Sequence, residues 1–355
     1  MKIIRASCWK ENLELTKPYT IAYTTVDAVE NFFVVIELEN GLTGIGAGSP
    51  SDFVTGEDLL ESFAALNAHL EALVVGEDIR HFSAILRQIR AILAPYPAAR
   101  AAIDIALYDA FTKMIGTPLA NYLGKAHEGL PTSITIGIKS LEETLEEAIE
   151  DVKLGFRIIK LKTGLEVEKD IAVFRKLRET VGAEVKIRVD ANQGYSIPDL
   201  LRFVDETRDA DVEFIEQPFK AGHQHWMLQL PEPVRQLCAA DEDLHNPADA
   251  MRMAVPTRPY GIYNIKLMKC GGVSESLHIA EAAHRFGISL MWGCMDESII
   301  SISAALHAAM ASPATRYLDL DGSFDLARDV VSGGFILRDG YLFPNGKPGL
   351  GVMRL

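Results

Sequence analysis

Five ionisable side chains follow short apolar runs of this chain at nearly constant intervals. They are Lys162, Asp190, Glu216, Asp241 and Lys266, and the steps between them are 28, 26, 25 and 25 residues. An interval of this size accommodates one strand and one helix, and the carboxyl ends of the parallel strands of a closed barrel meet on one face. The spacing therefore predicts that three carboxylates and two lysines converge on that face.

Three carboxylates in one place repel one another strongly unless a cation lies between them. Carboxylate and water oxygens are the ligands that suit Mg²⁺. We therefore assign Asp190, Glu216 and Asp241 as ligands of Mg²⁺. For any one of these residues, a helix cap or a solvated strand end is the commoner interpretation, but five residues in the same register make that interpretation poor.

The lysines indicate proton transfer. Lys160 and Lys162 stand two residues apart in one expected strand, so both point toward the mouth or interior of the barrel, while Lys266 comes from the opposite wall. Two lysines on either side of a metal-bound carboxylate suit a reaction in which one removes the α-proton and the other returns a proton to the opposite face. Lys160 and the metal would stabilise the enediolate oxygens. We expect this crowding of positive charge to lower a lysine pKa toward the working pH.

The elements that must position these residues alternate regularly. From residue 132 onward, short apolar runs alternate with helical patterns such as residues 141–154, 167–180 and 298–311, which predicts an α/β fold with a parallel (β/α) barrel. An eighth helix is doubtful, because its candidate segment, residues 324–329, is short. The expected strands span residues 133–138, 157–162, 185–190, 212–216, 237–241, 262–266, 288–292 and 316–320.

The first 125 residues have a different pattern. Residues 32–38 and 42–47 indicate two antiparallel strands joined by a turn, and residues 57–123 are helical in pattern, with one long helix at residues 98–115. We expect an α+β capping domain at residues 1–125, the barrel at residues 126–322, and a C-terminal segment, residues 323–355, that returns to the capping domain.

Composition limits the function classes. The net charge of −14 over 355 residues argues against a nucleic-acid partner, which needs a basic surface. No stretch reaches the length of a membrane span, the N-terminus has no apolar signal region, and the four cysteines show no paired spacing. We expect a cytoplasmic protein that contacts neither nucleic acid nor membrane.

Several short motifs coincide with these positions. Lys160-x-Lys162, Asp190-Ala191-Asn192, Glu216-Gln217-Pro218, Asp241-Glu242 and Asn264-Ile265-Lys266 resemble those of the muconate lactonizing enzyme subgroup of the enolase superfamily. The resemblance covers nearly the whole chain. It implies Mg²⁺, a modified TIM barrel of the type (β/α)₇β beneath a capping domain, abstraction of a proton α to a carboxylate, and homo-oligomers.

The last expected strand carries a further pair of carboxylates. Asp319 and Asp321 point to the same side of this strand, at the barrel mouth. The pair is similar to the one with which dipeptide epimerases hold the α-ammonium of the substrate, and charge-assisted hydrogen bonds make this chemically sound. The alternative is that these two residues cap the following segment or bind a surface cation.

Other substrate contacts are expected in loops. Asp296 precedes Glu297-Ser298, which resemble the Glu-Ser of the family at this point, and it either contacts the substrate or caps the helix that follows. We also expect contacts from the capping-domain loops at residues 17–26 and 49–56, among them Tyr23, Thr24 and Asp52. The first loop lacks the arginine that holds glutamate in Ala-Glu epimerases.

These observations predict an isomerase, a dipeptide epimerase acting on the C-terminal residue of L,L-dipeptides by two-lysine proton transfer. The absence of that arginine favours neutral, hydrophobic or cationic dipeptides over Ala-Glu. The alternatives are an N-acyl amino acid racemase, an o-succinylbenzoate synthase or a muconate-type cycloisomerase of the same superfamily, and further away a non-catalytic metal-binding scaffold.

Overall fold

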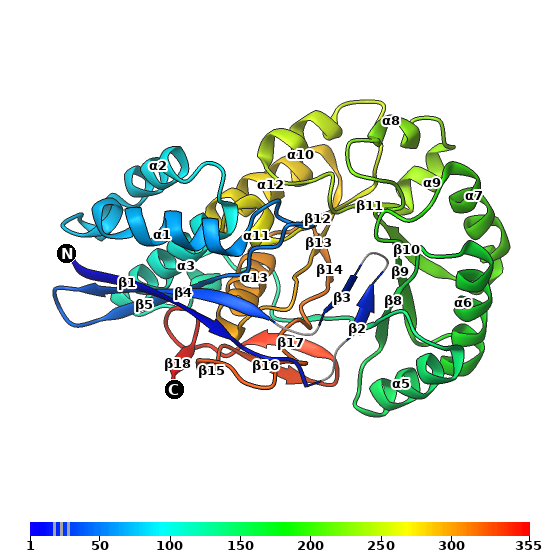
Figure 1. Cartoon of the computed structure of the whole chain (residues 1–355), viewed down its shortest axis with the longest axis horizontal. Coiled ribbons are helices and arrows are strands. Elements are labelled where there is room, and N and C mark those ends of the chain that lie inside the picture. The colour runs from blue at the N-terminus through cyan, green and yellow to red at the C-terminus, as the bar shows by residue number, and fades with distance from the viewer. Residues whose placement is uncertain (17–18, 22–23, 27–28) are drawn as a thin grey trace.

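The computed structural model describes residues 1–16, 19–21, 24–26 and 29–355, and it describes side chains outside residues 17–28. Figure 1 shows two parts: a small sheet with helices near the N-terminus, and a curled sheet with helices around it. The second part confirms the predicted alternation of strands and helices.

Eight parallel strands form the curled sheet, and neighbouring strands follow one another in chain order. A parallel β-bridge between Thr132 and Leu318 brings the two edges of this sheet, its first and its last strand, together. Each expected strand is present with its ends within two residues of the prediction. The strands are β7 (Ile134–Ile136), β8 (Ile158–Lys162), β9 (Lys186–Asp190), β10 (Val212–Glu216), β11 (Cys238–Ala240), β12 (Ile262–Ile265), β13 (Ser289–Trp292) and β14 (Thr315–Leu318).

Helices cover the outside of this sheet (Figure 1). Ser140 and Ser196 each form a capping box that fixes the first turn of a helix, α5 and α7 respectively. The helices are α5 (Leu141–Lys153), α6 (Val167–Val181), α7 (Ile197–Glu206), η2 (Arg208–Ala210), α8 (Gln224–Met227), α9 (Glu232–Gln236), α10 (Pro247–Ala254), α11 (Leu267–Cys270), α12 (Val273–Phe286) and α13 (Ile299–Ala311).

No helix follows β14, which agrees with the doubt about an eighth one. Residues 324–329 instead run along the chain that follows β1: Thr16 N–H donates to the Asp325 carbonyl, and Ala327 N–H donates to the Glu14 carbonyl. The backbone groups of this segment are therefore satisfied by the N-terminal part rather than by a helical turn. The capping part of the chain therefore contacts the barrel at this point.

The N-terminal part is built on an antiparallel sheet of three strands, β1 (Ile3–Asn12), β4 (Glu30–Leu38) and β5 (Thr43–Gly48). A short hairpin, β2 (Tyr19–Ile21) and β3 (Thr24–Val26), extends from it. The helices of this part are α1 (Leu59–Val74), η1 (Ile79–His81), α2 (Phe82–Ile92), α3 (Pro97–Met114) and α4 (Leu119–Leu123).

Helix α3 is buried nearly all round, which fits its run of alanines. It lies directly on the backbone of β5: a methyl group at Gly44, Gly46 or Gly48 would overlap backbone atoms of α3 or the ring of Phe32. Asp104 of α3 accepts a hydrogen bond from the N–H of Val273 at 2.6 Å and so binds the start of α12. The helix thus joins the N-terminal sheet to the barrel.

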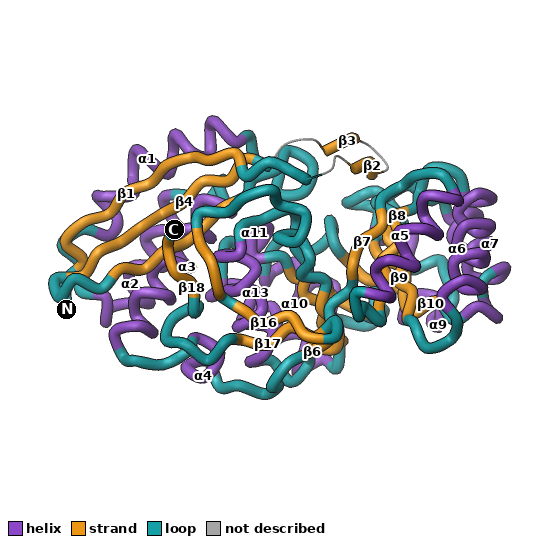
Figure 2. The backbone as a smooth tube through the Cα atoms, turned by 90° about the horizontal axis from the view of Figure 1, so that it is seen from below, coloured by secondary structure: helices purple, strands orange, loops and turns teal. Residues whose placement is uncertain are grey.

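The C-terminal residues return to the N-terminal part, as Figure 2 shows from below for β18. Leu350 N–H donates to buried Asp109 of α3, and Gly349 N–H donates to the Thr117 carbonyl. The strands here are β15 (Val331–Gly333), β16 (Phe335–Arg338), β17 (Tyr341–Pro344) and β18 (Val352–Arg354), and β17 also pairs with β6 (Leu130–Pro131). Among the described residues, no helix is long and apolar enough to cross a membrane.

Candidate active site

The structure brings the five strand-end residues together. Lys162 is opposite Asp190 in the β8–β9 register, and Asp190 is opposite Glu216 in the β9–β10 register. Asp241 and Lys266 directly follow β11 and β12. The periodic spacing in the sequence therefore corresponds to neighbouring positions at one end of the curled sheet.

Lysine–carboxylate ion pairs connect these residues. Lys162 Nζ lies 2.7 Å from Asp190 Oδ2, and Lys266 Nζ lies 2.8 Å from Asp241 Oδ2. Lys160 Nζ contacts carboxylates on three strands: Glu216 at 2.8 Å, Asp190 at 3.1 Å and Asp319 at 2.7 Å. Lys160 and the carboxylates are almost completely buried, so each charge depends on its partners rather than on water.

These contacts shift the pKa values of the carboxylates apart. Burial acts to raise the pKa of Asp190, but Lys162 and Lys160 outweigh it and lower this pKa to about 2. Burial, helped by repulsion from Asp190, raises the pKa of Glu216 to about 7. Burial and repulsion from Asp241 raise the pKa of the adjacent Glu242 to about 8. Such divergent pKa values are typical of functional sites.

The carboxylates that contact Lys160 and Lys266 favour the charged forms of these lysines. Burial acts to lower the pKa of Lys266, but attraction to Asp241 and Glu216 outweighs it and raises this pKa above its ordinary value. The pKa of Lys160 is raised in the same way, by Asp319, Glu216 and Asp190 against the effect of burial. The lowered lysine pKa expected from the sequence depends on the positive charge of Mg²⁺ beside the lysines, and it stays a prediction.

The donor set suits a hard divalent cation. In the part of the chain that the structure describes, no group of three or more His, Cys, Asp or Glu side chains has the arrangement of a formed metal site, and the carboxylates turn to lysines instead. Both buried carboxylate oxygens of Glu242 remain without a hydrogen bond, and Glu216 Oε2 has only the ion pair with Lys160 Nζ among the described residues. Oxygen donors of this kind, on adjacent strand ends, fit Mg²⁺ chemically.

Asp319 and Asp321 line the same cavity as the lysines. Asp319 accepts hydrogen bonds from Lys160 Nζ at 2.7 Å and Ser133 Oγ at 2.6 Å, and Asp321 accepts one from the Thr135 N–H at 2.7 Å. No helix follows them, so neither acts as a helix cap. Attraction to Lys160 lowers the pKa of Asp319 against the effect of burial, whereas burial and Asp319 raise the pKa of Asp321 to about 7.

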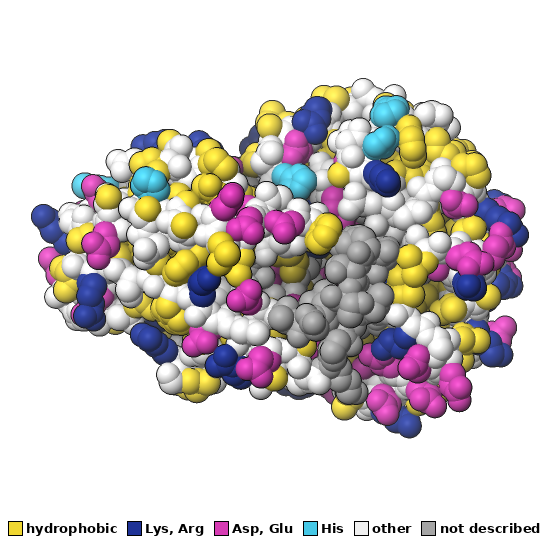
Figure 3. Space-filling model, in the orientation of Figure 1, with side chains coloured by type: hydrophobic (Ala, Val, Ile, Leu, Met, Phe, Trp, Pro, Cys, Tyr) yellow, Lys and Arg dark blue, Asp and Glu magenta, His cyan; other side chains and the backbone are white. Residues whose placement is uncertain are grey.

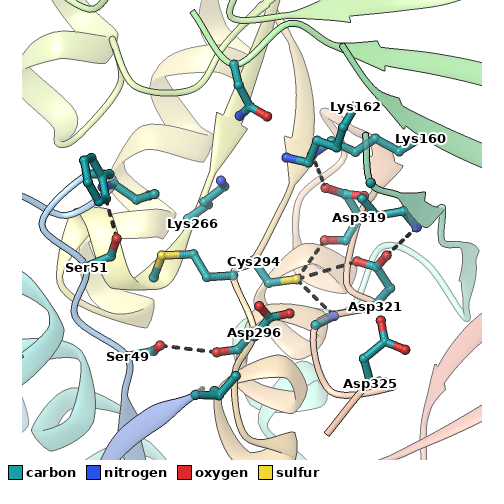
Figure 4. A pocket seen from close by; sticks show the side chains of 18 of the residues that line it. Ser49, Ser51, Lys160, Lys162, Lys266, Cys294, Asp296, Asp319, Asp321 and Asp325 are labelled. Carbon is teal, nitrogen blue, oxygen red and sulfur yellow. Dashed lines mark hydrogen bonds and ion pairs between the residues drawn. The ribbon is translucent and has the colours of Figure 1, made fainter. Parts of the chain in front are cut away.

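The cavity has a volume of about 650 Å³ and lies between the barrel mouth and the loop after β5. Lys162 and Lys266 extend into it from opposite sides, and Asp321 and Asp325 lie together on one side of Cys294 (Figure 4). Asp52 and Asp296 also line it. The lining is strongly acidic, which suits a ligand that carries positive charge.

The two interpretations of Asp296 can be separated. The N-cap of α13 is Ser298, whose hydroxyl accepts from the Ile300 N–H, and Asp329 accepts from the Ile299 N–H at 2.7 Å. The backbone carbonyl of Asp296 accepts a hydrogen bond from Ser49 Oγ, and its side chain lines the cavity. Asp296 is therefore not the cap, and the sequence reasoning missed the cap that Asp329 provides from far along the chain.

Lys269 is a further buried charge that the sequence reasoning missed. It lies one helical turn beyond Lys266, and its Nζ contacts Asp241 Oδ1 and the Asp241 carbonyl. Its position in α11, three residues after a predicted base, was the available signal. Two other expected contacts cannot be compared, because Tyr23 and the side chain of Thr24 lie outside the described residues.

The curled parallel sheet, the α+β part that covers its mouth and the carboxylates and lysines at successive strand ends together define an enolase-like barrel protein. The chain belongs to the mandelate racemase/muconate lactonizing enzyme family. The model of that family's N-terminal domain matches residues 3–124, and a model described as enolase C-terminal domain-like matches residues 143–353.

Individual relatives are similar over their whole length. An L-Lys-D/L-Arg epimerase of Desulforapulum autotrophicum is 54% identical over 355 residues, with 100% of both chains covered. The crystal structure of a dipeptide epimerase from Methylococcus capsulatus, complexed with Mg and the dipeptide L-Arg-D-Lys, matches with a TM-score of 0.98 at 50% identity, covering 99% of this chain and 100% of that one. A dipeptide epimerase from Enterococcus faecalis, complexed with Mg and L-Leu-L-Tyr, has a TM-score of 0.94 at 35% identity and covers 99% of both chains.

Proposed function

We propose that this protein is a dipeptide epimerase that inverts the α-carbon of the C-terminal residue of L,L-dipeptides, with a preference for cationic dipeptides. The observation that carries the proposal is the pair Lys162 and Lys266, which extend into one cavity from opposite sides beside buried carboxylates. The acidic lining and the 54% identity to an L-Lys-D/L-Arg epimerase support the cationic preference within the range expected from the sequence.

In the proposed mechanism the α-carbon lies between Lys162 and Lys266. One Nζ removes the α-proton, and the other delivers a proton from the opposite side, so the configuration inverts. Lys160 places a positive charge beside the reacting carboxylate and stabilises the negative charge that develops there. Mg²⁺, held by Asp190, Glu216 and Asp241, would supply further positive charge next to the same carboxylate.

In the same proposal, Asp319 and Asp321 bind the α-ammonium group of the substrate. A carboxylate pair attracts an ammonium group and opposes the anionic tail of an N-succinyl amino acid. Asp319 is buried and pairs with Lys160, so an ammonium group bound at this pair would keep the N-terminal residue close to the reacting centre. An N-acylated amino acid has no ammonium group to offer this pair, and this separates the proposal from an N-acyl amino acid racemase.

The experiment is mass spectrometry of L,L-dipeptide mixtures incubated with the protein and Mg²⁺ in D₂O. We expect a gain of one deuteron at the C-terminal residue, strongest for dipeptides of Lys and Arg. The variants Lys162→Ala and Lys266→Ala should each lose inversion, because one of the two faces of the α-carbon then has no base. Exchange with N-succinyl-lysine but with no dipeptide would refute the dipeptide assignment, and unchanged inversion in both variants would refute the two-lysine mechanism.

A further inference from the structure

A second group of carboxylates lines the cavity away from the lysines. Glu147, Glu150 and Asp151 belong to one face of α5, since they are three and four residues apart, and Asp325 follows β14. Figure 3 shows acidic side chains gathered over the region of α5. The proposed chemistry uses none of these four residues.

Asp151 distinguishes this group from an ordinary solvated helix face. Its side chain is only 9% exposed, and its Oδ2 is buried with no hydrogen-bond partner. Lys139, which also lines the cavity, pairs with Glu147. A buried carboxylate without a partner costs free energy, so one that lines a cavity points to a ligand that supplies the missing donor.

The surroundings of Asp151 make that ligand a cation. Burial and repulsion from Glu147, Asp325 and Glu150 raise the pKa of Asp151 to about 7. A cationic group placed among four carboxylates would remove this repulsion and satisfy Asp151 Oδ2. A neutral donor could hydrogen-bond to Asp151 Oδ2 but would leave the repulsion among the carboxylates in place.

The order of residues along the cavity identifies which part of the substrate reaches this group. The reacting α-carbon lies between Lys162 and Lys266 in the proposed function, and the α-ammonium of the N-terminal residue lies at Asp319 and Asp321. Asp325 is on the same side of the cavity as Asp321 (Figure 4). A long side chain that starts beside the α-ammonium can therefore continue toward Asp325 and α5.

We propose that Glu147, Glu150, Asp151 and Asp325 form a subsite for the cationic side chain of the substrate's N-terminal residue. This inference rests on the proposed dipeptide epimerisation and adds the residues that select lysine or arginine at the first position. These residues are distinct from Asp319 and Asp321, which hold the α-ammonium. The two positive charges of an N-terminal lysine would therefore bind at two different sets of carboxylates.

The test compares three substrates by the kcat/KM of deuterium exchange at their C-terminal residue. L-Lys-L-Ala carries the cationic side chain, L-norleucyl-L-Ala has the same chain without the charge, and L-Ala-L-Lys carries the charge on the other residue. Asp151→Asn removes the buried charge at almost constant shape. Glu146→Gln is the matched control, because Glu146 is exposed on α5 and does not line the cavity.

For Asp151→Asn we expect the preference for L-Lys-L-Ala over L-norleucyl-L-Ala to fall about tenfold or more, as for loss of a charge-assisted hydrogen bond. We expect L-Ala-L-Lys to be unaffected and Glu146→Gln to keep the wild-type preference. Should Asp151→Asn fail to fold, the double variant Glu147→Gln, Glu150→Gln gives the same comparison without touching the buried position.

Two outcomes overturn the subsite. One is an unchanged preference in the variants, and the other is a loss confined to L-Ala-L-Lys, which would assign the carboxylates to the C-terminal residue. If the wild-type protein with Mg²⁺ exchanges no dipeptide at all, the proposed function fails instead, and the two failures are thereby distinguished.

Discussion

His307 of α13 makes the stability of this protein sensitive to mild acid. The side chain is fully buried, and its Nδ1 accepts a hydrogen bond from the Ala120 N–H at 2.8 Å. Only an unprotonated Nδ1 can accept this bond, and Nε2 has no partner among the described residues. Burial, with a smaller contribution from Lys125, lowers the pKa of His307 from 6.5 to about 4.

The sign and size of the effect follow from linkage. Between about pH 4 and pH 6.5 the unfolded chain binds a proton at His307 that the folded chain does not, so stability falls as the pH falls through this window. A shift of about 2.5 units, at about 1.4 kcal/mol per unit, gives a loss of roughly 3 kcal/mol. That is a large part of the free energy of unfolding of an ordinary protein.

The assay is urea denaturation at several pH values between 4 and 7 for the wild-type protein and His307→Asn. The asparagine Oδ1 can replace Nδ1 as the acceptor for the Ala120 N–H but does not take up a proton in this range. Carboxylates titrate in both proteins, so the difference between the two curves isolates His307. We expect the wild-type protein to lose about 3 kcal/mol more than the variant, and parallel curves would refute the reasoning.

Three further predictions follow from the structure. Gly46→Ala should lower the free energy of unfolding by about 1–3 kcal/mol in urea denaturation, because its methyl group would overlap the α3 backbone; an unchanged value would mean that α3 can move away. Removal of Mg²⁺ with a chelator should abolish deuterium exchange and re-addition should restore it, whereas persistent exchange in chelator would contradict the assigned ligands. Asp151→Asn should melt at a higher temperature than the wild-type protein at pH 8. The pKa of Asp151 is raised on folding, so the folded wild-type protein loses stability as the pH rises from about 4 to about 7, whereas asparagine does not ionise. An equal melting temperature would show that the charge of Asp151 is already offset by a partner.

The fold could be predicted from the sequence because its signals are local and repeated. Each barrel strand is a short apolar run, and Asp190, Glu216 and Asp241 recur with the period of one strand and one helix. The same period was enough to bring Lys162 and Lys266 to one cavity. The domain boundaries, the cytoplasmic location and the homo-oligomer remain predictions.

What sequence reasoning missed depends on contacts between distant residues. Asp329 caps α13 from 30 residues away, and Asp325 hydrogen-bonds to Thr16 through its backbone across 309 residues. The ion pairs of the lysines belong to the same class: the charge of each residue is visible in the sequence, but the number of carboxylates within reach of Lys160 Nζ is not. In the sequence Asp151 is one of several acidic residues in a helical segment, and only its burial in the structure sets it apart.

The glycines of β5 fix the position at which the following loop begins. Because Gly44, Gly46 and Gly48 let α3 lie against the strand backbone, residue 49 leaves the sheet at a fixed place and direction. Residues such as Asp52 beyond that point line the cavity and can be exchanged without disturbing the core. A change of the cavity lining in this loop therefore leaves the positions of Lys162 and Lys266, which lie at the ends of barrel strands, as they are.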